Sequence, residues 1–223
     1  MTEKIDSGEL AALLRRGVDQ LGINLVDEQI DRLIELVGLL IKWDRAYNLT
    51  AIRDPREIVI KHLLDSLSIE SFIDDARIID VGTGGGFPGL PLAIARPSAQ
   101  FVLLDASAKK VRFVQRASDT LGLENVAAVH GRVEDYVEQK FDIVVCRAFA
   151  SLEDIVALTG HLLASGGRIL AMKGQTTQHS DAPVLNAAWR AEEQPVVVPL
   201  LTGARHLVQV TRIGNLESIQ PQD

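Results

Sequence analysis

A glycine-rich stretch is the segment of this sequence best suited to hold a ligand. It reads DVGTGGGFPG over residues 80–89. Its first two residues are the end of the apolar run at residues 78–81. Glycine adopts positive φ without steric cost and lets a ligand approach the backbone, and the start of a following helix offers free amide groups. The stretch is therefore predicted to hold a ligand against its backbone. The alternative is a tight turn between strand and helix that binds nothing.

The spacing of the glycines separates two ligand classes. In the dinucleotide fingerprint the third glycine stands five positions after the first, because helix and strand pack closely there. Counted from Gly82 that position is Phe87, although a frame that starts at Gly84 does fit. An acidic residue, Asp80, followed by glycines at alternate positions instead resembles the loop with which class I methyltransferases bind S-adenosylmethionine.

A second acidic residue supports a nucleoside ligand of either class. Asp105 ends the apolar run 101–104, and a carboxylate in that place can accept two hydrogen bonds from a ribose diol. After the next apolar run, Val133 could pack on an adenine ring and Glu134 could meet its edge. The alternatives are an exposed acid at a strand end and an ordinary loop.

Short apolar runs alternate with helical stretches from residue 73 onward. Continuous runs of this kind are typical of strands covered on both faces of a parallel sheet, and the alternation indicates a doubly wound α/β fold. The last two runs have no helix between them, which predicts an antiparallel hairpin at one edge. The predicted strands are 78–81, 101–104, 126–129, 143–146, 169–172, 196–200 and 207–213, and the predicted helices between them are 91–96, 109–122 and 152–164.

Helical periodicity dominates the residues before this region and predicts helices over 9–22, 27–47 and 54–71. At the start of the third helix Asp54 can cap and Pro55 suits the first helical position. We therefore predict two domains, a helical cap over residues 1–72 and a sheet domain over residues 73–223.

Composition bounds the location and the partners. The 223 residues carry a net charge of −7, which argues against a general nucleic-acid coat but allows a local basic patch. The single cysteine cannot form an internal disulfide, and the first residues lack the apolar core of a signal peptide. No apolar run approaches the roughly 20 residues of a membrane helix. We expect a cytoplasmic protein without membrane contact.

Several segments in this order and spacing resemble one family over nearly the whole chain. They are KWDRAYNLT at 42–50, RDP at 53–55, HLLDS at 62–66, the glycine loop at 80–91, LLD at 103–105, KKVRF at 109–113, RAFASL at 147–152, KG at 173–174 and RHL at 205–207. The family is the small-subunit ribosomal RNA methyltransferase G family, formerly called glucose-inhibited division protein B. The YNLT and RAFA segments make the resemblance specific.

The resemblance implies a Rossmann-like class I methyltransferase with a mostly parallel seven-stranded sheet and a C-terminal antiparallel hairpin. It implies S-adenosylmethionine as cofactor and methylation of N7 of guanine 527, in the 530 loop of 16S rRNA. The expected partner is 16S rRNA or the small ribosomal subunit, and we expect a monomer. The implied cofactor contacts are Gly82, Phe87, Val133, Glu134 and Arg147, with Asp105 at the ribose, and the loop itself adds Gly84 and Gly86. One departure is Ala106, where the family often has serine.

Methylation of guanine N7 requires no catalytic base, and the sequence offers no residue that we assign as one. N7 carries a lone pair and no proton, so its methylation is a direct displacement that needs no general base. Catalysis would then rest on alignment, which can be worth roughly 7 to 11 kcal/mol. Arg147 and Lys173 are candidates for that alignment, no residue is assigned as a catalytic base, and no metal site is expected. Cys146 invites comparison with cytosine C5 methyltransferases, but it lacks their preceding proline and is predicted to be a buried core thiol.

Recognition of the guanine must leave N7 free. The common arginine fork takes both O6 and N7, so we expect contacts to O6, to the Watson–Crick edge and to phosphates of a looped RNA. Two alternatives remain for the RNA-binding candidates named below. A solvated helix face explains residues 109–116 almost as well, and His62 can instead be a helix residue that meets Asp65. The RNA-binding candidates are Arg53, Lys61, His62, Lys109, Lys110, Arg112 and Lys173.

Two other functions stay open at this point. An NAD(P)-dependent Rossmann oxidoreductase would need a His or Tyr acid–base pair at the sheet edge, and none is evident. A non-enzymatic rRNA-binding or assembly factor built on a methyltransferase scaffold has the same sequence features as the enzyme.

Overall fold

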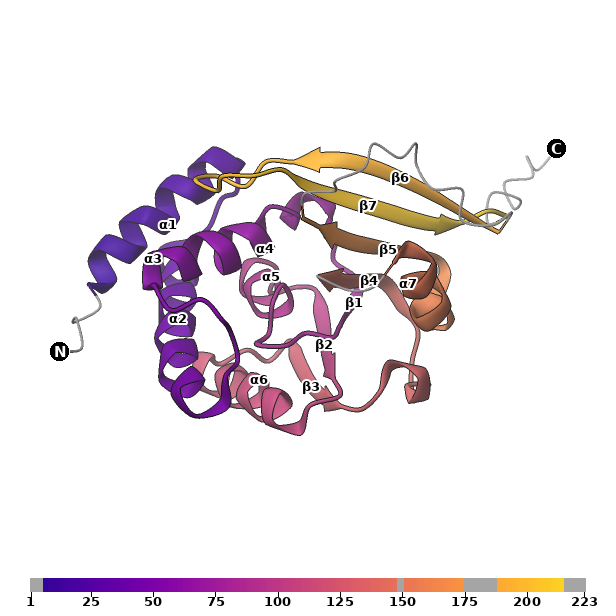
Figure 1. Cartoon of the computed structure of the whole chain (residues 1–223), viewed down its shortest axis with the longest axis horizontal. Coiled ribbons are helices and arrows are strands. Elements are labelled where there is room, and N and C mark those ends of the chain that lie inside the picture. The colour runs from indigo at the N-terminus through magenta and orange to yellow at the C-terminus, as the bar shows by residue number, and fades with distance from the viewer. Residues whose placement is uncertain (1–5, 148–150, 175–187, 215–223) are drawn as a thin grey trace.

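A twisted sheet runs through the middle of the computed structural model, which describes residues 6–147, 151–174 and 188–214 (Figure 1). The strand order is β3-β2-β1-β4-β5-β7-β6, and β7 runs opposite to the other six strands. The strands are β1 (Arg77–Val81), β2 (Gln100–Asp105), β3 (Val126–His130), β4 (Phe141–Arg147), β5 (Leu163–Lys173), β6 (Trp189–Val196) and β7 (Arg205–Arg212). This mostly parallel seven-stranded sheet with an antiparallel hairpin confirms the predicted fold class.

The carboxyl ends of the first five strands meet at one edge of the sheet. β7 runs in the opposite direction, so its first residues return to the same edge, where His206 pairs with Lys173 of β5. Ligands of open α/β sheets bind at this edge. The fold therefore gathers residues from six strands around one potential site.

The hairpin differs from its predicted position at its first strand. β6 covers Trp189–Val196, whereas the sequence predicted 196–200. β6 is the outermost strand, and each of its residues is exposed or half-buried. Its sequence therefore lacks the continuous apolar run that marks the inner strands. The predicted helix 152–164 is also shorter, since α7 (Leu152–Thr159) passes through the 3-10 turn Gly160–Leu162 directly into β5.

Helices cover both faces of the sheet. On one face α5 (Gly89–Ala95) and α6 (Ala108–Leu121) pack together with the N-terminal helices on side chains such as Ile78 and Leu103. On the other face α7 packs on the residues that directly follow these two in the sequence, Ile79 and Leu104. The alternation along β1 and β2 is the period-two pattern of a strand with two buried faces.

The N-terminal region forms the helices predicted for it. α1 (Ser7–Leu21) and α2 (Asp27–Tyr47) are followed by α3 (Pro55–Ile58), the π-helical segment Val59–Leu64, α4 (Asp65–Leu67) and the 3-10 turn Glu70–Phe72. Asp54 caps α3 as expected, with Oδ1 accepting from the amides of Arg56 and Glu57. We call residues 7–72 the cap.

The cap and the sheet share one hydrophobic core. Leu14 and Leu33 of the cap belong to the same buried cluster as Phe101 of β2 and Phe113 of α6. The domain boundary between residues 72 and 73 stays a prediction, because this core runs across it. Within the described ranges, no helix is long and apolar enough to cross a membrane.

Candidate functional site

The first of two cavities at the carboxyl edge lies at the ends of β1, β2 and β3. It has a volume of about 300 Å³ and brings together four residues predicted to bind the cofactor: Gly82, Asp105, Val133 and Glu134. The remaining lining residues are Val81, Leu104, Ala106, Gly131, Arg132 and Leu158. The cavity thus offers apolar walls for a ring and a carboxylate for a diol. We call it the edge cavity.

Asp105 is the most precisely held polar group of the edge cavity. Its Oδ2 accepts a hydrogen bond from the amide of Gly84 at 2.9 Å, and its Oδ1 accepts one from the amide of Ser107 at 2.8 Å. Lys110 Nζ lies 3.7 Å from Oδ2. Each carboxylate oxygen has two lone pairs, so both oxygens keep capacity to accept from a ligand. The two backbone bonds fix the orientation of the carboxylate.

Asp80 plays a structural part in the glycine loop. Its Oδ2 accepts from Thr83 Oγ1 at 2.6 Å and from the amide of Gly89 at 2.9 Å, which ties both ends of the loop to β1. Burial raises the pKa of Asp80 to about 6, against the opposing effect of these two hydrogen bonds. Among the described residues nothing donates to its buried Oδ1.

The loop glycines serve different purposes. Gly82, Gly84 and Gly86 all have positive φ, which favours glycine at each position. A Cβ at Gly86 would also lie 2.3 Å from Leu90 Cδ1, so close packing on α5 requires that glycine. A Cβ at Gly84 would meet only the carbonyl of Gly82, at 3.9 Å. Gly84 therefore presents an open backbone, while a cofactor contact at Gly86 stays a prediction.

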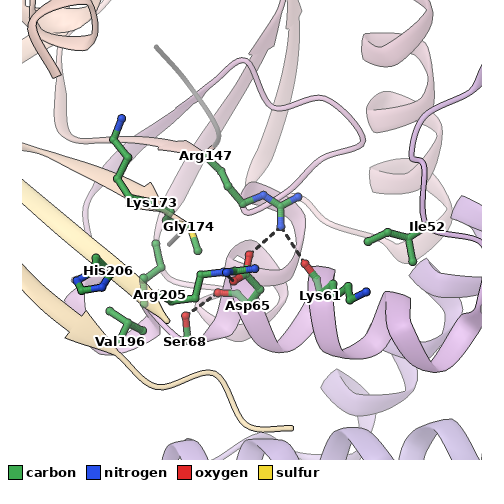
Figure 2. A pocket seen from close by; sticks show the side chains of 12 residues that line it. Ile52, Lys61, Asp65, Ser68, Arg147, Lys173, Gly174, Val196, Arg205 and His206 are labelled. Atoms are coloured by element: carbon green, nitrogen blue, oxygen red, sulfur yellow. Dashed lines mark hydrogen bonds and ion pairs between the residues drawn. The ribbon is translucent and has the colours of Figure 1, made fainter. Parts of the chain in front are cut away.

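The second cavity lies beside the cap, at the ends of β4 and β5 and the start of β7 (Figure 2). Its volume is about 350 Å³, and its lining includes the predicted residues Lys61, Arg147 and Lys173. The other lining residues are Ile52, Asp65, Ser68, Ile69, Met172, Gly174, Val196, Arg205 and His206. We call it the cap cavity.

A buried carboxylate holds two arginines in the cap cavity. Arg147 Nη1 donates to Asp65 Oδ2 at 3.1 Å, and Arg205 Nε donates to Asp65 Oδ1 at 2.9 Å (Figure 2). The Asp65 side chain is 6% exposed and the arginines are 20% and 28% exposed. Two guanidinium groups share one carboxylate, and Lys61 and Lys173 add two further cations to the lining. The cap cavity is therefore suited to an anionic or electron-rich ligand.

Sequence reasoning did not assign Asp65 or Arg205 to the site. Both stand in segments that carried the family resemblance, but the pairing spans 140 residues and no local pattern predicts it. Arg205 lies at the site only because β7 runs antiparallel, which places the start of that strand at the ligand edge.

The predicted RNA-binding residues divide into three groups. Lys61 and Lys173 line the cap cavity, whereas Lys109, Lys110 and Arg112 lie in the first turns of α6, near the edge cavity. In the cap, Arg53 pairs with buried Asp44 but keeps a 63% exposed side chain. His62 is half-buried behind Arg147. Residues 148–150 of the RAFA segment lie outside the described residues.

The cysteine has no access to a substrate. Cys146 lies inside β4, is 1% exposed, and burial raises the pKa of its thiol to about 12. A nucleophilic cysteine needs a thiolate, so this thiol is a core group, as predicted. In the described part of the chain no cluster of His, Cys, Asp or Glu is arranged to hold a metal ion.

Comparison with known proteins assigns the family. The family model for rRNA small subunit methyltransferase G matches residues 29–208, which include both cavities and most of the cap. The chain belongs to this family. Family membership confirms the predicted resemblance, and it decides between the two ligand classes of the glycine loop in favour of a methyltransferase.

Named relatives match over almost their whole length. The ribosomal RNA small subunit methyltransferase G of Actinobacillus pleuropneumoniae serotype 3 (strain JL03) is 46% identical over 199 residues, which cover 89% of this chain and 97% of the relative. The protein of the same name from Erwinia tasmaniensis is 45% identical over 206 residues, covering 92% and 98%.

A solved structure agrees at the level of the fold. The crystal structure of a SAM-dependent methyltransferase from Aquifex aeolicus aligns with a TM-score of 0.53 over 76% of this chain and 96% of the other, at 14% identity. At that identity the likeness shows the class I fold alone.

Proposed function

We propose that this member of the methyltransferase G family transfers a methyl group from S-adenosylmethionine to N7 of guanine 527, in the 530 loop of 16S rRNA. The observation that carries the proposal is the pair of cavities at one sheet edge. One offers a fixed carboxylate for a ribose, and the other offers cations held by a single carboxylate.

The edge cavity fits the nucleoside part of the cofactor. Asp105 would accept from the two ribose hydroxyls, since its oxygens are oriented by Gly84 and Ser107 and keep free lone pairs. Val133 is 8% exposed and would pack on the adenine ring, with Glu134 at its edge. When bound, S-adenosylmethionine supplies a methyl group activated by the sulfonium.

The cap cavity would receive the target base. Its lining includes Arg205, Lys61 and Lys173, which can meet O6 of a guanine and the phosphates beside it, while Arg147 keeps its predicted contact to the cofactor. Displacement by N7 releases no proton from the base, so no proton acceptor is required. Asp65 engages both arginines with its two oxygens and so holds the donors in place. Alignment of the base is what the described residues would contribute to the rate.

Asp105 provides a direct test of the cofactor site. Asp105→Ala removes the acceptor of both ribose hydroxyls, and we expect the affinity for S-adenosylhomocysteine to fall at least tenfold in isothermal titration calorimetry. Asp135→Asn is the matched control, because this exposed acid lies next to the edge cavity but does not line it. Equal affinities of the two variants would contradict the assignment.

The partner and the location follow from the proposed substrate. A 16S rRNA or small-subunit substrate requires access to ribosomes, in agreement with the predicted cytoplasmic location. The monomeric state stays a prediction.

A further inference from the structure

His62 links three parts of the molecule that are far apart in the sequence. Its ring lies in the π-helical segment of the cap and stacks on Phe87 of the glycine loop, with ring centroids 4.6 Å apart. Its Nε2 is 2.8 Å from Thr50 Oγ1, and its Nδ1 is 3.2 Å from Nη2 of Arg147 at the end of β4. π-helical turns are frequent at functional sites, and this one brings a single ring against two proposed cofactor contacts.

The contacts of the ring determine which nitrogen carries the proton. An arginine is always a donor, so Nδ1 must accept from Arg147. Nε2 then carries the proton of the neutral ring and donates to Thr50 Oγ1. That oxygen also accepts from the amide of Ile52 at 3.1 Å. Desolvation, followed by the charge of Arg147, lowers the pKa of His62 to about 3, in agreement with a neutral ring.

Residues of the cap accept hydrogen bonds from most of the N–H groups of the Arg147 guanidinium. Nη1 donates to Asp65 Oδ2 and to the carbonyl of Lys61, and Nη2 donates to His62. A guanidinium group has five N–H bonds. Nε–H and one Nη2–H have no partner among the residues that the structure describes, so they remain for a ligand. The guanidinium carbon also lies 5.6 Å from the centre of the Phe87 ring.

Thr50 is itself fixed by the end of α2. Its amide donates to Oδ1 of buried Asp44 at 2.9 Å, and Arg53 pairs with the other oxygen of the same carboxylate. The loop between α2 and α3 is thus anchored on the cap, and it holds the ring of His62 from the side opposite Arg147.

We infer that His62 is a positioning residue that holds the side chains of Arg147 and Phe87. It does so as a neutral ring with its proton on Nε2, and it does not contact RNA. This inference rests on the proposed function and replaces the RNA-binding role predicted for His62. Its consequence is that loss of the ring weakens cofactor binding and leaves RNA binding unchanged.

The protonation state can be measured in the intact protein without any activity. ¹⁵N-histidine NMR, with the His62 signals assigned by their loss in His62→Asn, is expected to show a neutral ring protonated on Nε2 throughout pH 5 to 8. The charged group in contact with the ring is Arg147, which is itself paired with Asp65, and neither of them is expected to reverse this assignment. A cationic ring, or a proton on Nδ1, would overturn the inference.

Binding measurements separate positioning from RNA contact. We expect His62→Asn and Thr50→Val each to weaken S-adenosylhomocysteine binding about tenfold, with 16S rRNA binding within twofold of wild type. Thr50→Ser keeps the acceptor and is expected to restore cofactor affinity. His161→Asn is the control, since His161 lies against Tyr136 on the other face of the sheet and both affinities should stay unchanged.

Two outcomes would count against the proposals in different ways. Weakened RNA binding with unchanged cofactor binding in His62→Asn would overturn the positioning role. Failure of the wild-type chain to bind S-adenosylhomocysteine would overturn the proposed function, while the NMR result would still decide the state of the ring.

Discussion

Two aspartates at the ends of adjacent strands differ in role because their surroundings differ. Asp105 lines the edge cavity, where two amides fix its oxygens and leave lone pairs for the proposed cofactor. Asp80 is 1% exposed, and among the described residues its side chain bonds only to its own loop, through Thr83 and Gly89. The same side chain thus has a proposed role in recognition in one place and a structural role in the loop in the other.

The buried Asp80 makes a testable contribution to the pH dependence of stability. Its pKa is about 6 in the folded chain, against an ordinary value of 3.8, so the folded protein holds this proton more tightly than the unfolded one. The stabilisation is fully present below pH 3.8 and is lost as pH rises through 6. Relative to Asp80→Asn, the free energy of unfolding of the wild type should fall by on the order of 2 to 3 kcal/mol between about pH 4 and pH 7.

Urea denaturation of both proteins at several pH values measures this difference. The comparison with Asp80→Asn removes the contributions of the other carboxylates, which both proteins share. A difference that is flat, or that rises with pH, would show that Asp80 is ionised at little cost in the folded chain.

At the scale of the elements, the cap depends on close packing of α1 against the π-helical segment. Gly17 lies where a Cβ would be 2.4 Å from Cδ1 of Leu64, which is completely buried. A Cβ at Gly38 of α2 would have no atom within 4 Å apart from those of its chain neighbours and its own helix backbone. The two helical glycines therefore provide a matched pair.

Alanine substitution should change stability in opposite directions at these two sites. Gly17→Ala forces a shift in a filled core and should destabilise by about 1 to 3 kcal/mol. Gly38→Ala gains helix propensity without a clash and should stabilise by about 0.5 to 1 kcal/mol. Chemical denaturation of the three proteins measures both changes. Stabilisation of both variants would show that Leu64 can move aside and that the α1 contact is loose.

The elements that local patterns specify were the predictable ones. The inner strands appear as apolar runs because both their faces are buried, and α1 and α2 show helical periodicity because one face packs on the core. β6 was misplaced because this edge strand is exposed or half-buried throughout and so has no continuous apolar run. The glycine loop and Asp105 were found from sequence because their chemistry is local, while the contacts of Asp65 and His62 depend on tertiary packing that no local pattern contains.

At the scale of the whole molecule, a net charge of −7 must be reconciled with an RNA substrate. The cations that could meet RNA are concentrated: two lysines line the cap cavity beside its arginines, and Lys109 and Arg112 are exposed at the start of α6. This distribution fits one defined RNA site rather than a general coat.

Salt dependence tests the part played by α6. We expect Lys109→Ala combined with Arg112→Ala to weaken 16S rRNA binding and to reduce the slope of log affinity against log salt by about 1 to 2. Arg16→Ala is the control, because this exposed arginine lies on α1, which is well separated from α6 in Figure 1. An unchanged slope in the double variant would assign these residues to a solvated helix face.

The most direct test of the proposed function is methyl transfer from labelled S-adenosylmethionine to 16S rRNA and to small ribosomal subunits, followed by mapping of the modified nucleoside. The proposed function predicts label as N7-methylguanosine at guanine 527 alone. Absence of label on naked rRNA and on subunits alike, or label on another atom or base, would contradict the account.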